Sequence, residues 1–348
     1  MSEGLRFRFG EFETRVRFTE QGPESLLSAA GSLAVFDRNV RRLHGRRIDR
    51  AVVLPAGEPA KAWRWAERIM AAALKQGLSR DGLLVGVGGG VVCDLTAFAA
   101  SLYMRGCRLA LVPTTLLAMV DAALGGKSAL NLGRAKNLIG TFYPAEELVI
   151  WIPALATLPP AELRSGLAEA IKTALLGDAD LLAMLTDRRA ELLRGDPDAL
   201  AQTVRRCLAV KGRIVENDLR ESGRRAVLNL GHTFAHALES ATGFRRYRHG
   251  EAVAWGLARA LELGVALGVT ARPLASEVTA LLAAYGFQLG QPAGLSARTL
   301  LQAMRADKKR RVDGLRFVLL REVGSPEVRA VEEEEPVLAA LEAGVGGQ

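Results

Sequence analysis

Residues 85–98, VGVGGGVVCDLTAF, join an apolar strand-like run to a helix-like run through three consecutive glycines. Glycine has no Cβ, so a phosphate group can approach the backbone closely. The first turn of the following helix offers unpaired N–H groups and the positive end of its dipole to the anion. The stretch is not an ordinary G-x-G-x-x-G fingerprint, and a tight strand-to-helix turn is the alternative interpretation.

The same alternation of apolar runs and helical stretches extends on both sides of the glycines. Residues 50–57 (RAVVLPAG) precede a helical stretch at 61–77, and residues 108–115 (RLALVPTT) precede another at 116–126. Short strands that alternate with helices are typical of a parallel sheet with crossover helices. Residues 5–18 alternate apolar and polar side chains around FGEF, which predicts a hairpin with one buried face.

The pattern changes after residues 147–162, ELVIWIPALATLPPAE. Amphipathic helical segments then dominate until LRFVLL at residues 315–320. We therefore predict an α/β fold with two domains. Residues 1–158 are expected to form a Rossmann-like, parallel-sheet nucleotide-binding domain, and residues 159–348 a mostly helical domain that binds a metal ion and the substrate. The acidic residues 332–335 predict a solvated turn before a short helix.

Composition limits the possible classes of function. The chain has 348 residues, of which 49% are hydrophobic, and a formal net charge of +8, as in a soluble globular protein with more than one domain. Residues 1–18 lack the apolar core of a secretory signal, and no run is apolar enough to span a membrane, so we expect a cytoplasmic protein. Cys93, Cys107 and Cys207 are odd in number and widely separated, which favours reduced thiols.

The positive charge alone fits either nucleic acid or a small anionic substrate. The basic residues are spread along the chain and few aromatic residues accompany them. Proteins that bind single strands interleave the two kinds for base stacking, so the pattern favours a small anionic substrate and no nucleic-acid partner.

Several polar residues follow the predicted strands. Asp37 and Asn39 in FDRNV could accept hydrogen bonds from ribose hydroxyls, although a surface turn is the alternative. Glu58 and Lys61 in PAGEPAK open a helix, where capping is the alternative. The glycine pair before Lys127 is not a phosphate loop of the Walker type, because Asp121 stands where the first glycine would be.

Three of the four histidines cluster late in the sequence. His232 and His236 are spaced i, i+4 on one helical face, and His249 follows in HGEAV. Glu169 lies among apolar residues in a predicted helix, and two histidines with one glutamate form a known catalytic zinc set. The residues alone leave three histidines for two places. Helix capping, or pairing of the histidines with Glu239 and Glu251, is the alternative.

Basic residues near these histidines suit a substrate with phosphate and carboxylate groups. Lys211, Arg224 and Arg225 precede them, and Glu221 is spaced to hold Arg225 by an i, i+4 pair. Residues 307–311, DKKRR, add Lys308 and Lys309, for which a solvated charge run is the alternative.

Taken together, these motifs resemble the 3-dehydroquinate synthase family, within the sugar-phosphate cyclases. The resemblance runs from FDRNV to LRFVLL. The motifs that carry it are GEPAK (57–61), GGGVVCDLTAF (88–98), YMRG (103–106), VPTTLLAMVDAALGGKSALN (112–131), KNLIGTFYP (136–144), TLPPAELRSGLAEAIK (157–172), LNLGHTFAHALE (228–239), HGEAV (249–253) and DKKRRVDGLRFVLL (307–320).

The resemblance implies roles for individual residues. It makes Glu169, His232 and His249 the ligands of a Zn²⁺ or Co²⁺ ion. The positions that would contact NAD are Asp37, Asn39, Ala56, Gly57, Glu58, Pro59, Ala60, Lys61, Gly89, Gly90, Val91, Val92, Cys93, Asp94, Thr114, Thr115, Lys127, Lys136, Ala154, Leu155, Ala156 and Thr157. The positions around the substrate are Asp121, Lys127, Asn137, Lys172, Lys211, Glu221, Arg225, Asn229, His236 and one of Lys308 and Lys309. Arg105 matches an arginine that reaches the phosphate site of a neighbouring subunit, which implies a homodimer.

The activity implied is that of 3-dehydroquinate synthase in the shikimate pathway. A 3-deoxy-arabino-heptulosonate 7-phosphate would be cyclised to 3-dehydroquinate with release of phosphate and no net redox change. The sequence departs from the family pattern at Cys93, Ala97, Ser128, Ala129, Ala235 and Trp151. Because of the departures beside Lys127, another sugar-phosphate cyclase is an alternative, as is a metal-dependent polyol dehydrogenase.

Overall fold

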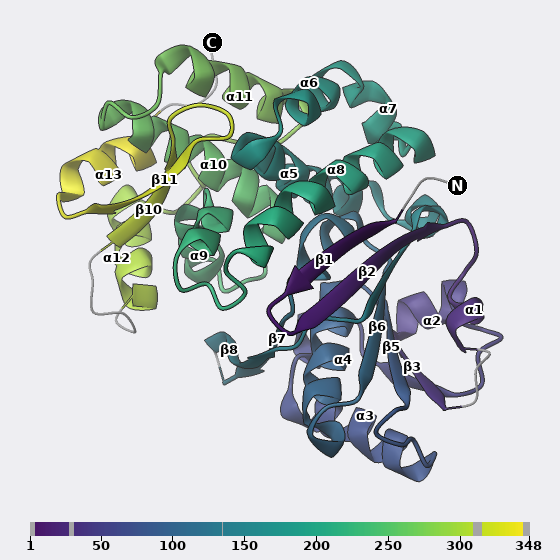
Figure 1. Cartoon of the computed structure of the whole chain (residues 1–348). Helices are drawn as coiled ribbons and strands as arrows, with labels where there is room; N and C mark the ends of the chain where they lie inside the picture. Colours follow the sequence, from purple (N-terminus) through teal and green to yellow (C-terminus); the bar gives the residue numbers. More distant parts are fainter. Residues whose placement is uncertain (1–3, 28–30, 134, 309–314, 344–348) are drawn as a thin grey trace. The chain divides into compact units, whose positions relative to one another are not determined.

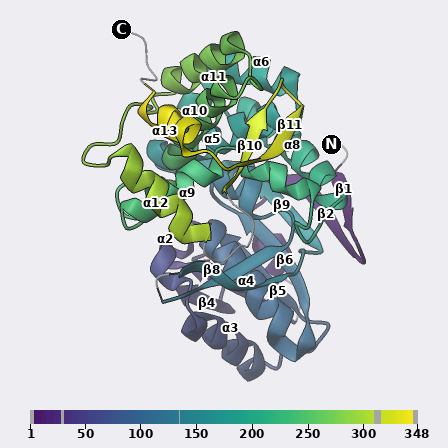
Figure 2. The same cartoon turned by 90° about the vertical axis from the view of Figure 1, so that its left-hand side faces the viewer.

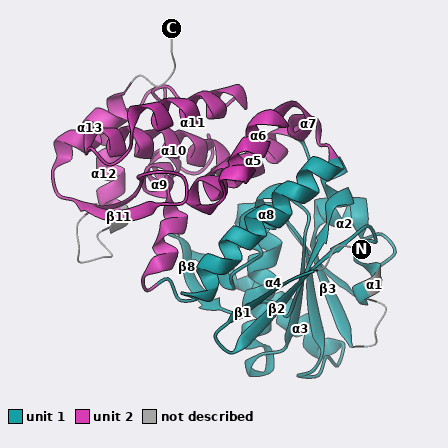
Figure 3. Cartoon of the chain, turned by 45° about the horizontal axis from the view of Figure 1, so that its top comes forward, with its two compact units in different colours: residues 1–159, 197–221 teal, residues 160–196, 222–348 magenta. Residues whose placement is uncertain are grey.

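The chain folds into two compact units, which we call unit 1 and unit 2 (Figure 3). The structure is a computed structural model and describes residues 4–27, 31–133, 135–308 and 315–343. Unit 1 comprises Met1–Pro159 and Pro197–Glu221, and unit 2 comprises Pro160–Asp196 and Ser222–Gln348. Residues 197–221, which we expected in the helical domain, therefore belong with the sheet.

Unit 1 is built on a seven-stranded sheet with the order β1-β2-β9-β6-β5-β3-β4 (Figure 1). Strand β1 pairs antiparallel with β2, and every other neighbouring pair is parallel. This confirms the predicted α/β class. The strands are β1 (Leu5–Phe9), β2 (Phe12–Thr19), β3 (Ser32–Asp37), β4 (Ala51–Leu54), β5 (Leu83–Gly88), β6 (Arg108–Pro113) and β9 (Glu147–Trp151). The connecting elements are α1 (Glu24–Leu27), α2 (Arg38–His44), η1 (Glu58–Ala60), α3 (Trp63–Lys75), α4 (Gly90–Leu102), η2 (Tyr103–Arg105), η3 (Ala118–Ala122) and η4 (Ile152–Thr157).

The central strands are almost continuously apolar because both faces of a parallel sheet are covered. Phe36 of β3, Val87 of β5 and Val112 of β6 are fully buried in one core. Helix α4 approaches this sheet closely at Gly86, where an added Cβ would lie 2.9 Å from the Thr96 hydroxyl. Residues 85–98 therefore form the end of an interior strand and the start of the helix that packs against it.

Helix α8 (Pro197–Glu216) belongs to unit 1 because its apolar face packs on the N-terminal hairpin. Gly212 makes the closest approach, since an added Cβ would lie 2.1 Å from the Phe7 ring. At the end of the helix, the Glu216 carboxylate accepts a 2.8 Å hydrogen bond from the Arg8 amide. An amphipathic pattern predicts such a helix but does not identify the surface that it covers.

A second hairpin in unit 1 was not predicted. The polar stretch after η3 forms β7 (Lys127–Leu132) and β8 (Ala135–Phe142), which pair antiparallel. Ser128 and Thr141 join the strands through their hydroxyls at 2.8 Å. The strands are hard to recognise in the sequence, because polar side chains interrupt the alternation of apolar and polar residues that reveals a half-buried strand.

Unit 2 is mostly helical, as predicted, and also holds one β-hairpin (Figure 2). Its helices are α5 (Pro160–Gly177), α6 (Ala179–Asp187), α7 (Arg189–Arg194), η5 (Arg224–Asn229), α9 (His232–Ala241), α10 (His249–Ala266), α11 (Arg272–Ala284), α12 (Ala297–Lys308) and α13 (Glu334–Glu342). The hairpin pairs β10 (Leu315–Leu320) with β11 (Pro326–Val331). Strand β11 was not predicted. The short helix α13 was predicted, but it begins at Glu334, inside the acidic run that we expected to form a turn.

Glycines bring α5, α9 and α10 unusually close to one another. A Cβ at Gly250 of α10 would lie 2.1 Å from the Ser165 carbonyl oxygen of α5, and the Gly250 amide donates to the Ser165 hydroxyl at 2.9 Å. A Cβ at Gly256 would lie 2.3 Å from the carbonyl oxygen of Gly231, at the start of α9. These backbone contacts fix the spacing of the three helices.

We expect Gly250→Ala to destabilise unit 2 by about 1–3 kcal/mol, because the added methyl group forces α5 and α10 apart. Gly290→Ala is the matched control, since a Cβ there meets nothing within 4 Å. Urea denaturation followed by circular dichroism compares the two variants with the wild type. Equal midpoints for Gly250→Ala and Gly290→Ala would contradict the close packing.

We also expect the native protein to resist thiol reagents. Burial raises the pKa of Cys93, with the Asp94 charge adding to the effect, and it raises the pKa of Cys107 to about 11. At pH 8, a pKa of 11 leaves roughly one Cys107 thiol in a thousand as the reactive thiolate. Cys207 is also buried. Titration with an aromatic disulfide should detect all three thiols only after denaturation, and rapid native reaction would overturn this.

Candidate functional site

Three side chains from three helices of unit 2 converge, and we call them the Glu169 cluster. Glu169 lies on α5, His232 begins α9 and His249 begins α10. One ligand atom from each lies within 4.8 Å of the others. The Glu169 Oε1 atom is 3.1 Å from His249 Nε2 and 3.5 Å from His232 Nε2. The close helix packing described above is what brings these residues together.

Glu169 is fully buried and held as a carboxylate. Burial opposes its ionisation, but the ammonium group of Lys172 at 2.6 Å and hydrogen bonds with both histidines outweigh that effect. The pKa of Glu169 is therefore well below its usual range. Lys172 is itself only 1% exposed. The i, i+3 spacing read from the sequence thus becomes a buried ion pair.

Both imidazoles present their Nε2 atoms to the same carboxylate oxygen. The Nδ1 atom of His232 lies 3.2 Å from the Leu230 carbonyl, and that of His249 lies 3.3 Å from Glu239 Oε1. If a metal took the place of the protons that the Nε2 atoms share with Glu169, a proton on each Nδ1 would still satisfy these acceptors and each Nε2 lone pair would bind the metal. Two imidazole nitrogens and one carboxylate oxygen are a donor set that fits Zn²⁺ and leaves a coordination position for a further ligand.

The electrostatics around His249 also favour a cation. Burial lowers the tendency of its ring to be charged, but hydrogen bonds with Glu169 and Glu239 raise its pKa to about 10. A position that attracts a proton so strongly attracts other positive ions as well. The charge distribution and the donor set therefore agree.

The remaining histidine of this region and the two glutamates of the alternative interpretation lie close by. His236 is one turn beyond His232, with ring centroids 5.5 Å apart. Glu239 does pair with His249, whereas Glu251 accepts from the Arg248 amide at 2.8 Å at the start of α10. Sequence analysis named Glu239 only within the alternative interpretation, although its i+7 spacing from His232 places both on one face of α9.

In unit 1, the residues predicted to contact NAD follow the carboxyl ends of the parallel strands. They come after β3, β4, β5, β6 and β9, and the carboxyl ends of parallel strands meet at one edge of a sheet. The residues placed there are Asp37, Asn39, Ala56, Gly57, Glu58, Pro59, Ala60, Lys61, Gly89, Gly90, Val91, Val92, Cys93, Asp94, Thr114, Thr115, Ala154, Leu155, Ala156 and Thr157. Lys127 and Lys136 lie on the β7–β8 hairpin.

The glycine loop has the form that an anion site needs. Gly89 is the N-cap of α4 and supplies no side-chain cap, so the first amides of the helix keep their donors available. A Cβ at Gly89 would lie 3.2 Å from Thr115. By contrast, the Asp37 carboxylate caps α2 by accepting from the Asn39 amide at 2.8 Å and the Val40 amide at 3.0 Å.

A polar network joins the edge of the sheet to the hairpin. The buried Lys61 ammonium donates to Asp94 at 2.5 Å and also donates to the Asn137 side chain. Asn131 of β7 donates to Glu58 at 2.8 Å. Residues that we selected from separate motifs for NAD and for substrate are therefore brought into one network.

The other predicted substrate residues fall in both units. In unit 1, Lys211 of α8 donates to Asp121 Oδ1 at 2.6 Å, and Lys127 pairs with Glu221. In unit 2, Arg225 and Asn229 lie on η5, where Arg225 is 1% exposed, and Lys172 and His236 lie beside the Glu169 cluster. Lys308 ends α12, and Lys309 lies outside the described residues. Arg105 is exposed in η2 and carries a left-handed φ of 65°.

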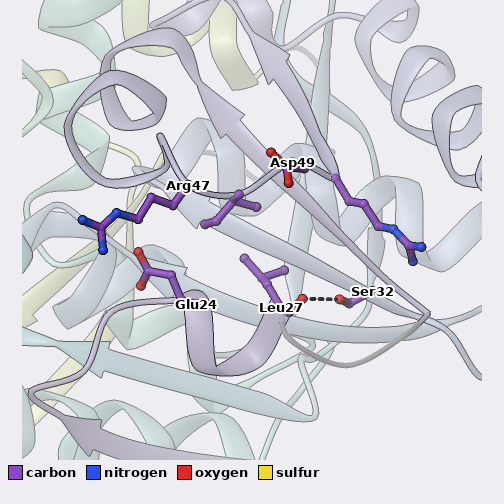
Figure 4. Close-up of a pocket in the computed structure, with 7 residues that line it drawn as sticks. Glu24, Leu27, Ser32, Arg47 and Asp49 are labelled. Carbon is purple, nitrogen blue, oxygen red and sulfur yellow. Dashed lines mark hydrogen bonds between the residues drawn. The ribbon is translucent and has the colours of Figure 1, made fainter.

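Unit 1 also contains a cavity of about 320 Å³, which lies away from the predicted site residues (Figure 4). Glu24, Leu27, Arg47 and Asp49 are among its lining residues, and Ser32 there donates to the Leu27 carbonyl. Ser32 begins β3, so the cavity is at the amino ends of the strands. None of the predicted site residues lines it.

No helix among residues 4–27, 31–133, 135–308 and 315–343 has the length and hydropathy needed to cross a membrane.

Family models and solved structures provide an independent comparison. The model described as 3-dehydroquinate synthase N-terminal matches residues 51–165, and the model described as 3-dehydroquinate synthase C-terminal matches residues 166–310. The two matches are contiguous and together extend from β4 into the segment that follows α12.

Among solved structures, a 2-epi-5-epi-valiolone synthase from Streptomyces hygroscopicus subsp. jinggangensis 5008, with NAD⁺ and Zn²⁺ bound, is 28% identical with a TM-score of 0.87. That match covers 96% of this chain and 97% of the other. A 2-deoxy-scyllo-inosose synthase complexed with carbaglucose-6-phosphate, NAD⁺ and Co²⁺ is 23% identical, with a TM-score of 0.86 and coverage of 98% and 99%.

A more distant structure is a probable glycerol dehydrogenase from Sinorhizobium meliloti 1021. It is 16% identical, with a TM-score of 0.63 and coverage of 97% of each chain, and this similarity concerns the fold alone. The family models and the 28% identical synthase structure agree with the motifs in the sequence. The chain belongs to the 3-dehydroquinate synthase-like superfamily of sugar-phosphate cyclases.

Proposed function

We propose that the protein is an NAD- and divalent-metal-dependent sugar-phosphate cyclase, and that its reaction is that of 3-dehydroquinate synthase. The observation that carries this proposal is the Glu169 cluster, a buried carboxylate shared by two imidazoles in a chain of this superfamily. The substrate would be 3-deoxy-arabino-heptulosonate 7-phosphate, and the products 3-dehydroquinate and inorganic phosphate.

Glu169, His232 and His249 would hold Zn²⁺ or Co²⁺, and the residues at the carboxyl ends of the unit 1 strands would hold NAD. When bound, the metal would supply Lewis acidity toward a coordinated hydroxyl group, and NAD would supply reversible hydride acceptance with no net oxidation.

The protein's own residues keep this site charged and ordered. Lys172 maintains Glu169 as an anion through the 2.6 Å ion pair, so the carboxylate stays available as a ligand. His236 lies one helical turn from His232 and could hold or deliver a proton at the substrate.

The basic residues account for the anionic substrate. Lys127, Lys211 and Arg225 each have charge suited to phosphate or carboxylate groups, and Lys211 and Arg225 are buried. Carboxylates already accompany two of them, since Lys211 pairs with Asp121 and Lys127 with Glu221. Such pairs hold the ammonium groups in fixed positions before an anion arrives.

A second candidate function is that of a 2-epi-5-epi-valiolone synthase. It is favoured by the 28% identity to a solved enzyme of that activity over nearly the whole chain. A polyol dehydrogenase shares the fold at 16% identity and would accumulate NADH.

We expect phosphate release from 3-deoxy-arabino-heptulosonate 7-phosphate when the protein is supplied with NAD and Zn²⁺ or Co²⁺, without accumulation of NADH. Parallel assays with sedoheptulose 7-phosphate and glucose 6-phosphate separate the cyclases, and glycerol tests for the dehydrogenase. Faster turnover of sedoheptulose 7-phosphate would replace the first proposal by the second candidate. Net NADH formation with glycerol would contradict both.

Glu169→Ala should abolish metal retention and greatly reduce phosphate release. A Lewis acid contributes several kcal/mol to a transition state, so we expect a fall on the order of a thousandfold. Glu277→Gln, an exposed residue of α11, is the control and should retain both properties. Metal content by mass spectrometry, measured with the rate, checks the result. Full activity in Glu169→Ala would count against the proposed site.

A further inference from the structure

We propose that Glu239 is a positioning residue that fixes the ring orientation and proton of His249, and so determines the affinity of the Glu169 cluster for a divalent metal. This inference rests on the metal-dependent function proposed above. Glu239 would act through His249 and would not itself be a ligand.

The His249 ring lies between two carboxylates. Its Nε2 atom is 3.1 Å from Glu169 Oε1, and its Nδ1 atom is 3.3 Å from Glu239 Oε1. With a metal at Nε2 the imidazole would be neutral and would carry its one proton on Nδ1. If Glu239 accepts the Nδ1 proton, the Nε2 lone pair faces Glu169 and is available to a metal.

His249 needs this support more than His232 does. His249 is the first residue of α10, and its side chain is 33% exposed, whereas that of His232 is 10% exposed. The Leu230 carbonyl, a rigid and neutral backbone group, lies against His232 Nδ1. For His249, a charged side chain takes the corresponding place, which makes the orientation sensitive to a single substitution.

Glu239 is well placed to perform this task. It is 7% exposed, and it lies in the last turn of α9, seven residues after His232. Its backbone carbonyl accepts hydrogen bonds from the Phe244 amide at 2.7 Å and the Thr242 hydroxyl at 3.2 Å, which hold the C-terminal end of α9. A carboxylate that is buried against an imidazole and fixed by its backbone restricts the ring to one orientation.

The test measures metal affinity in the full chain, in the absence of NAD and sugar phosphate. Metal-free wild type, Glu239→Gln and Glu239→Ala are titrated with Co²⁺ and Zn²⁺ against a competing chelator. We expect Glu239→Ala to bind about 10–100-fold more weakly, the usual effect of losing a carboxylate that orients a ligating histidine. Glu239→Gln should lose less, about threefold or more, because its amide oxygen still accepts the Nδ1 proton without the charge.

Glu262→Gln is the matched control on the same helix as His249. Glu262 pairs with Arg272 at 2.7 Å and should be replaceable without change in metal affinity. The visible absorption of bound Co²⁺ provides a second readout, because a changed His249 orientation alters the coordination geometry. Thermal unfolding of the metal-free proteins identifies any variant that merely fails to fold.

An affinity for Glu239→Ala within about twofold of the wild type would overturn the proposal, as would equal weakening in Glu262→Gln. If either result is obtained and the wild type still binds the metal tightly, the positioning role is wrong but the proposed function is not contradicted. Weak binding by the Glu239 variants supports the positioning role even if no sugar phosphate is cyclised, so failure of the two proposals can be distinguished.

Discussion

The structure of unit 2 depends on a carboxylate that is removed from water. Glu169 has no exposed surface, and an isolated charge in such a place is very costly. Lys172 compensates on one side and two imidazoles on the other, so the ionised form is the stable one. The Glu169–Lys172 pair lies within α5, whereas the histidines begin α9 and α10, so it is the contacts of Glu169 with the histidines that join the three helices.

The residues of this site could be predicted from the sequence, but not the contacts that they make with one another. The spacing of His232 and His236 and the apolar surroundings of Glu169 identify candidates, and the family motifs choose among them. Spacing along a helix does not reveal which side chain from another helix a residue meets. Glu239 was therefore considered only as a partner of the histidines in an alternative without a metal. Its pairing with His249 is, however, compatible with metal binding.

The fold of unit 1 was predicted where local patterns determine it. Continuous apolar strands and a glycine turn before α4 are local signals, and they correctly indicated a parallel sheet. The β7–β8 hairpin gave no such signal, because its strands are stabilised by polar pairs such as Ser128 with Thr141. The place of α8 also depends on distant packing, since Gly212 reveals its role only when Phe7 lies against it.

The return of residues 197–221 to unit 1 bears on how the chain folds during its synthesis. A ribosome that has produced residues 1–159 has completed every strand of the sheet, yet the helix that covers Phe7 is still missing. The N-terminal hairpin must therefore keep part of its apolar surface exposed while α5, α6 and α7 are being added. Nascent chains of intermediate length should accordingly depend most on chaperones, and release from them should coincide with the emergence of α8 from the exit tunnel.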